Sequence, residues 1–184
     1  MKIKFLLKRG LDFLILLIVL AFFCWKFENV SAQTKSKTAG DKSKSLCLTN
    51  EQTIWSCATT KHKTASVCAS EDLAEDEGYV QYRFGTVGKL EFEFPKMQSD
   101  TQKSFTYSRY TRPLVTRLTL TFENAGFIYE IHDDDESDVE PPVQYASIDI
   151  TNSESRDIST IDCKWPTTGS LIKLEDIVLG DEDN

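Results

Sequence analysis

Hydrophobic and polar residues alternate along several short runs of the chain. In residues 80–84 and again in 90–94, every second side chain is aromatic or aliphatic, and the stretch 85–88 between them begins and ends with glycine. Such alternation predicts strands with one buried and one wet face, and glycine allows a tight turn between them. We therefore expect an antiparallel hairpin here.

The two faces of this hairpin are expected to have different roles. The apolar set should pack into the core: Val80, Tyr82, Phe84, Leu90, Phe92 and Phe94. The opposite set should be wet and is our candidate contact face for a partner: Tyr79, Gln81, Arg83, Glu91 and Glu93. A register slip of one residue would exchange the two sets.

Three further pairs of alternating runs are each separated by a polar link: 53–59 and 64–70, 118–122 and 127–131, 146–151 and 158–165. About eight short strands with short turns predict an all-β fold, a small antiparallel barrel or sandwich of consecutive hairpins. Near the C-terminus, residues 170–178 have the spacing of a short helix that Ser170 would cap, and a strand is the alternative for this apolar run.

The N-terminal residues have a different pattern. Lysine and arginine in 1–10 precede an apolar run, and Val30-Ser31-Ala32 has the small-x-small form that signal peptidase recognises. We interpret 1–32 as a signal peptide cleaved after Ala32. The apolar run is shorter than the roughly twenty residues of a membrane-spanning helix, and an uncleaved anchor is the alternative. Residues 33–46, rich in Lys and Ser, predict a flexible polar tether before a single β-rich domain over 47–184.

Charge narrows the classes of partner. Without residues 1–32 the chain keeps 16 basic and 27 acidic residues, a net charge near −11. Nucleic acids and anionic lipids reward clusters of Lys and Arg, so neither is expected to bind, and no stable membrane insertion is expected after cleavage. The charge favours a basic protein as partner, or serves solubility alone. It does not define an oligomeric state.

Four of the five cysteines fall in the predicted domain: Cys47, Cys57, Cys68 and Cys163. An even number in an exported chain predicts two disulfides and a periplasmic or secreted location. The spacings lack the close pairs typical of zinc sites, and no cofactor is expected. Three pairings are open. Because Cys57 and Cys68 flank a predicted hairpin turn, we expect them to pair, which leaves Cys47 for Cys163.

Residues with catalytic potential are few. The two histidines are His62, at a predicted hairpin tip, and His132, which opens an acidic run. We interpret that run as a solvated loop between strands. The alternative is a Ca²⁺ site on Asp133, Asp134 and Asp135, although the EF-hand spacing and its glycine are absent. The G-x-S-x-G nucleophile motif does not occur either.

Two motifs carry a resemblance to a known family. The stretches 67–70 (VCAS) and 78–85 (GYVQYRFG) resemble the signature of a family of small exported bacterial proteins of unassigned function. The resemblance implies export but no activity. A looser likeness is to periplasmic lysozyme inhibitors, which are disulfide-bearing antiparallel barrels with a Ser-Gly-x-x-Tyr type loop that enters the lysozyme cleft. The stretch 104–110 of this chain lacks that glycine.

The sequence favours an exported, non-catalytic binding module, such as an inhibitor or immunity protein for a basic envelope hydrolase. The alternatives are a metal-dependent or carboxylate-based enzyme built around His132 and the acidic run, and a structural component of the envelope.

Overall fold

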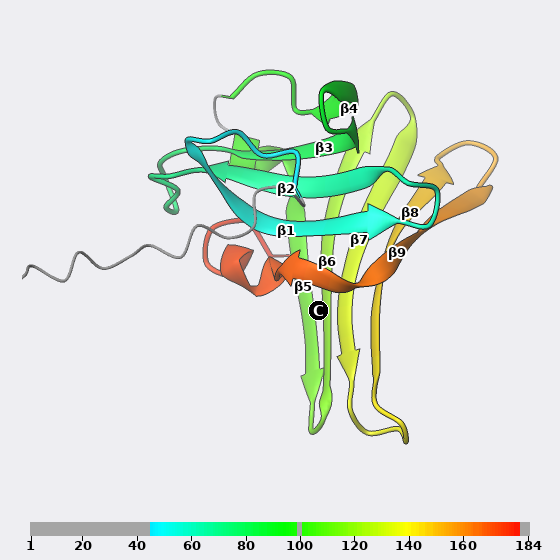
Figure 1. The fold of residues 1–184 in the computed structure, drawn as a ribbon. Coiled ribbons are helices and arrows are strands. Elements are labelled where there is room, and N and C mark those ends of the chain that lie inside the picture. Colours follow the sequence, from blue (N-terminus) through cyan, green and yellow to red (C-terminus); the bar gives the residue numbers. More distant parts are fainter. Residues whose placement is uncertain (1–44, 99–100, 181–184) are drawn as a thin grey trace, which may run out of the picture. The chain divides into compact units, whose positions relative to one another are not determined.

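Nine strands form one antiparallel sheet in the computed structural model, which describes residues 45–98 and 101–180 (Figure 1). In chain order the strands are β1 (Glu51–Thr59), β2 (Thr64–Ser70), β3 (Val80–Thr86), β4 (Lys89–Phe94), β5 (Thr106–Arg112), β6 (Val115–Asn124), β7 (Phe127–Glu136), β8 (Val143–Asn152) and β9 (Ile158–Gly169). Among the described residues there are two single-turn 3₁₀ helices, η2 (Thr101–Ser104) and η3 (Leu171–Leu174). The predicted all-β class is confirmed. The predicted signal peptide and residues 33–44 of the tether lie outside the described residues.

The spatial order of the strands is β4-β3-β2-β1-β9-β8-β7-β6-β5. Every neighbouring pair is a consecutive hairpin except β1 with β9. One end of β9 pairs with β8 and the other end with β1, so this long strand joins the two parts of the sheet. The sheet thereby curls into a half-barrel, with β1–β4 on one side of the core and β5–β8 on the other (Figure 1).

Aromatic rings from both parts of the sheet meet in the core. Phe122 of β6 lies at the centre, with ring centroids 5.3 Å from Tyr82, 4.5 Å from Phe94, 5.5 Å from Phe105 and 4.6 Å from Tyr129. Such ring pairs stabilise a core beyond the area that they bury. The density of aromatic residues on β3 and β4 is thus explained by packing.

The predicted apolar face of the first hairpin is largely correct. Val80 and Tyr82 are buried, and Phe84, Phe92 and Phe94 pack against the core cluster. Leu90 is the exception, because it is exposed at the start of the edge strand β4.

The predicted helix after Ser170 is present only as the single turn η3. Ser170 is its N-cap, and its Oγ accepts a hydrogen bond from the N–H of Ile172 at 3.4 Å. Within the described residues, no helix has the length and the apolar character needed to cross a membrane.

The disulfide pairing differs from the prediction. Cys47 is bonded to Cys68, and Cys57 to Cys163. Although Cys57 and Cys68 lie on adjacent strands, the register places Cys57 opposite Ala65, so the two cysteines are not neighbours. The Cys57–Cys163 bond ties β1 to β9 instead, at the point where the two parts of the sheet meet. Two disulfides indicate an oxidising compartment.

The folded domain begins before the predicted boundary at residue 47. Ser45 is buried and its hydroxyl contacts that of Thr53 at 3.0 Å, while the N–H of Leu46 donates to Ser66 Oγ at 3.0 Å. Ser66 lies opposite Arg83 on the face of β2 and β3 turned away from the core. The segment 45–50 therefore covers this second face.

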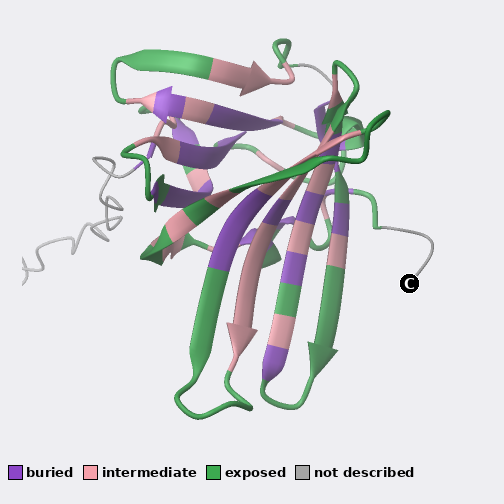
Figure 2. Ribbon diagram, turned by 90° about the vertical axis from the view of Figure 1, so that its right-hand side faces the viewer, coloured by how far each residue is buried: buried purple, intermediate pink, exposed green. Residues whose placement is uncertain are grey.

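The far ends of β5, β6, β7 and β8 extend beyond the core as two adjacent hairpins (Figures 1 and 2). We call residues 108–118 and 133–146 the projecting hairpins. Figure 2 shows mostly exposed and half-buried residues there. This part of the sheet offers both of its faces to solvent.

Candidate functional site

The predicted contact face on β3 is mostly not a surface. Gln81 is only 1% and Arg83 3% exposed. The Leu46 carbonyl of segment 45–50 accepts a hydrogen bond from Arg83, whereas Gln81 is hydrogen-bonded to the segment 95–98 that follows β4. Tyr79 and Glu93 are half-buried, and Glu91 is exposed. The expectation of a wet face is therefore wrong for Gln81 and Arg83. The alternation of polar and apolar residues within a strand does not predict that another segment of the chain covers the polar face.

Arg83 is the centre of a buried ion network. Its Nη1 and Nη2 donate to the two carboxylate oxygens of Glu51 at 2.5 and 2.8 Å. The remaining N–H groups donate to Glu93 Oε1 at 2.9 Å, to Gln81 Oε1 at 2.6 Å and to the Leu46 carbonyl at 3.3 Å. All five guanidinium N–H groups thus have an acceptor, as burial of this cation requires.

The network also sets the protonation of its members. Burial by itself raises the pKa of Glu51, but hydrogen bonds from Arg83, from the Tyr79 hydroxyl and from the Leu48 N–H outweigh it and lower the pKa below the usual 4.5. Burial and the bond to Glu51 raise the pKa of Tyr79 to about 12. Glu51 is therefore a fixed anion and Tyr79 a fixed donor at neutral pH.

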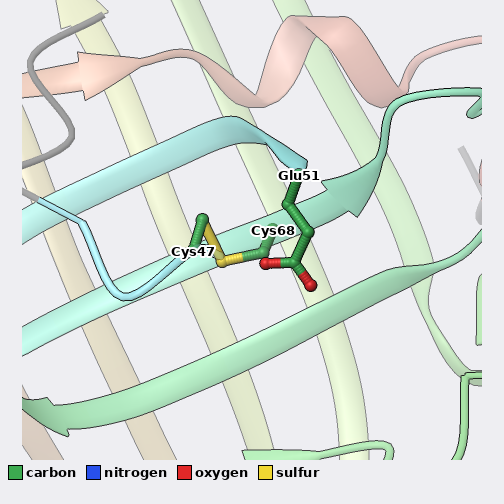
Figure 3. Close-up of side chains that lie close together, drawn as sticks. All are labelled: Cys47, Glu51 and Cys68. Atoms are coloured by element: carbon green, nitrogen blue, oxygen red, sulfur yellow. A yellow bond between two sulfur atoms is a disulfide. The ribbon is translucent and has the colours of Figure 1, made fainter. Parts of the chain in front are cut away.

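Cys47, Glu51 and Cys68 converge beside this network (Figure 3). Among the described residues, they are the only three metal-ligating side chains whose donor atoms all lie within 4.8 Å of one another. The two sulfur atoms are bonded to each other, however. The Glu51 oxygens accept four hydrogen bonds, from Arg83 twice, Tyr79 and Leu48. In this oxidised state the cluster holds segment 45–50 in place, because the acceptor positions of Glu51 are used and sulfur atoms joined in a disulfide do not offer the thiolate that binds a metal ion.

The acidic run that follows His132 is a strand, not the predicted loop. β7 continues to Glu136, and the loop comprises residues 137–142. Since successive side chains of a strand point to opposite faces, Asp133 and Asp135 share the face of core residue Ile131, whereas Asp134 shares the face of His132. The three carboxylates do not converge on one point, so the structure does not assemble the Ca²⁺ site considered above.

Each of these aspartates already has partners. Asp133 Oδ2 accepts from Ser170 Oγ at 2.8 Å and from the Leu171 N–H at 3.1 Å, which ties β7 to η3. Hydrogen bonds from Gln144 and Ser137 lower the pKa of Asp135. Burial raises the pKa of Asp134, despite the Leu118 N–H that donates to it.

The two histidines lie far from any assembled catalytic group. His62 occupies the β1–β2 turn with φ 60° and is exposed. His132 Nδ1 lies 3.3 Å from Thr119 Oγ1, directly opposite on β6, and its Nε2 lies 3.6 Å from Asp149, diagonally across on β8. The N–H groups of β7 are used in ladders with β6 and β8, so this strand cannot supply an oxyanion hole.

The chain contains a Ser-x-x-Lys spacing, Ser170 to Lys173, which was not predicted above and which is typical of enzymes with a serine nucleophile and a lysine base. In the structure Ser170 donates to Asp133, and Lys173 Nζ reaches the Thr53 carbonyl at 3.5 Å. The hydroxyl therefore caps η3 rather than serving a lysine base.

The arginines of the projecting hairpins are all paired. Arg109 binds Glu175 at 2.5 and 2.7 Å, Arg112 binds Asp138 at 2.7 Å, and Arg117 binds Glu136. Six acidic residues occupy the same segments: Asp133, Asp134, Asp135, Glu136, Asp138 and Glu140. Because the positive charges are neutralised internally, the projecting hairpins carry a net negative charge.

A pocket of about 200 Å³ opens on the inner face of the projecting hairpins. Exposed Trp165 of β9 lines it together with Gln144, Thr116 and the acidic run. An aromatic ring thus lies near carboxylates at this end of the molecule.

No protein-family model matches the chain, and no curated protein or solved structure was found to be similar to it. The resemblances noted from the sequence therefore stay predictions.

Proposed function

We propose that this protein is an exported, non-catalytic binding module whose partner is a basic protein, such as a hydrolase of the cell envelope. The observation that carries the proposal is the uncompensated negative charge of the projecting hairpins, where all three arginines are held by carboxylates of the same chain. Opposite charge on a partner accelerates encounter and selects against acidic proteins.

The rigidity of the sheet suits a protein whose role is to bind a partner. Two disulfides, the Arg83–Glu51 network and the aromatic core fix the sheet, so little conformational entropy is lost when a partner docks. The residues with catalytic potential, His132, Ser170 and the aspartates of β7, are engaged in contacts that hold strands and η3 together.

An inhibitor of a basic hydrolase would not use the loop mode of the lysozyme inhibitors named above. The stretch 104–110 ends η2 and forms most of the edge strand β5, so it has no free loop to insert. We expect a broad sheet face to cover the partner instead.

Titration of the exported, oxidised protein into lysozymes of several types tests this function. We expect binding, with inhibition of cell-wall lysis, to at least one basic enzyme, and an affinity that falls steeply as ionic strength rises. The variant Asp138→Asn with Glu140→Gln, exposed at the tip of the second projecting hairpin, tests whether the effect comes from the hairpins, and Asp72→Asn with Asp76→Asn, exposed in the β2–β3 loop, is the matched control. Binding that is independent of salt, or failure to bind any basic hydrolase, would contradict the proposal.

A further inference from the structure

We infer that the partner docks on the outer face of the projecting hairpins, centred on Tyr110, Arg117, Asp134 and Tyr145. This inference rests on the proposed function and adds the location of the partner's binding site. We call these four residues together with Val143 the tyrosine face.

The register of the sheet brings these side chains together. Tyr110, Arg117, Asp134 and Tyr145 are directly opposite one another across β5, β6, β7 and β8, and therefore form one row on one face. Val143 lies two positions from Tyr145 and shares the face. This is the face opposite the core residues Leu120 and Ile131.

Large apolar and aromatic side chains are exposed on this face. Tyr110 is 50%, Tyr145 44% and Val143 46% exposed. Tyrosine is among the residues that contribute most to binding when a partner buries them, because a large amphipathic ring is fixed by only two torsions.

The face is ordered before a partner arrives. The Arg117 guanidinium lies over the Tyr110 ring, 6.0 Å from its centroid, and Glu136 holds Arg117 from the next row. On the same face, two positions from Arg117, Val115 is buried, so the hairpin tips have a small apolar centre of their own. Docking therefore requires little rearrangement.

Charge complementarity selects a basic occupant. Along the same face toward the core, the rows carry Glu130, Asp149 and Asp162, next to the tyrosine face. Lysine or arginine side chains of a partner would meet these carboxylates while the apolar stems and rings pack on Tyr110 and Tyr145.

Two other surfaces have only half of this combination. The β2–β3 loop holds five acidic residues in 71–77, but the exposed large apolar side chain in the pocket that Glu75 and Asp76 line is the aliphatic Leu179 and not an aromatic ring. The groove between segment 45–49 and the β3–β4 turn, of about 560 Å³, exposes Leu48, Val87 and Leu90, but it has Lys89 at its rim. The tyrosine face unites aromatic anchors with an acidic surround.

Chemical-shift mapping with a hexaarginine peptide as the probe tests the inference on the intact protein. We expect salt-sensitive shifts concentrated on β5–β8 around Tyr110, Arg117, Asp134 and Tyr145. Tyr110→Ala with Tyr145→Ala should weaken peptide binding about tenfold, while Leu48→Ala with Val87→Ala, equally exposed but distant, should leave it unchanged. Tyr110→Phe with Tyr145→Phe should retain most of the affinity because the rings remain.

Shifts confined to the 71–77 loop, or tyrosine variants that bind like the unmodified protein, would overturn the site while leaving a basic partner in place. Absence of any peptide binding, together with failure of every basic hydrolase to bind, would overturn the proposed function as well. Melting temperatures of all variants should match that of the unmodified protein, since the substituted side chains are exposed.

Discussion

Arg83 and Glu51 bury opposite charges on the face of the sheet where Ser66, Cys68 and Gln81 are also buried. The Arg83 and Glu51 side chains are 4% and 0% exposed. Removing such a pair as a whole is often tolerated, but removing one member leaves an uncompensated buried charge. The pair therefore fixes where segment 45–50 lies more than it adds net stability.

Arg83→Leu should lower the free energy of unfolding by about 3–5 kcal/mol, because Glu51 loses its counter-charge. The double variant Arg83→Leu with Glu51→Gln should recover much of that loss. Denaturant unfolding measures both, with Arg117→Leu as the control for an exposed ion pair that should change little. Equal stability of the single and double variants would contradict a buried ionic role.

Asp134→Asn should stabilise the protein at neutral pH. Burial raises the pKa of Asp134 above its usual 3.8, so the folded state binds this proton more tightly than the unfolded state and its ionised form costs stability. The gain should shrink as the pH falls through the raised pKa and vanish below 3.8. Asp135→Asn, whose pKa is lowered by its hydrogen bonds, should destabilise at neutral pH. Urea unfolding midpoints, measured from neutral pH to below pH 3.8, test both the stabilisation by Asp134→Asn and the destabilisation by Asp135→Asn.

At the scale of elements, local alternation was sufficient to predict eight of the nine strands. β5 was missed because its sequence, TYSRYTR, has no alternation of apolar residues. β5 is an edge strand, so one of its sides faces solvent instead of another strand. The candidate contact residues failed for a different reason. Arg83 is covered from Leu46, 37 positions away, and Gln81 is bonded to the segment 95–98 after β4, so periodicity within β3 carries no sign of either contact.

Gly169 ends β9 where that strand meets β1. Its φ is +77°, and a Cβ added there would lie 2.1 Å from the Ile54 carbonyl oxygen. Gly169→Ala should therefore cost about 3 kcal/mol or more, from backbone strain and overlap together. Gly126→Ala, with φ +81° but open space around it, should cost only about 1 kcal/mol. Thermal or denaturant unfolding distinguishes the two; similar losses would refute close contact between β9 and β1.

In the part of the chain that the structure describes, one non-local strand pair joins the two parts of the sheet. β1 and β9 lie side by side at the centre of the sheet although Cys57 and Cys163 are 106 positions apart. The remaining sheet consists of hairpins that can form locally.

Loss of Cys57–Cys163 should destabilise more than loss of Cys47–Cys68. Loop-closure entropy gives about 5 kcal/mol for the longer loop and about 3 kcal/mol for the 21-position loop. Serine double variants compared by denaturant unfolding measure the difference. Peptide mapping of the oxidised protein should recover Cys57 linked to Cys163; a Cys57–Cys68 peptide would contradict the pairing.

This arrangement has a consequence for biogenesis. A chain made from its N-terminus presents Cys47, Cys57 and Cys68 together, long before Cys163 emerges. During that interval Cys57 is an unpaired thiol between two cysteines that belong to each other, and either wrong bond would block the closing of β9 onto β1. The protein should therefore depend on a disulfide isomerase for its yield in the cell, while a variant with Cys57 and Cys163 replaced by serine should not.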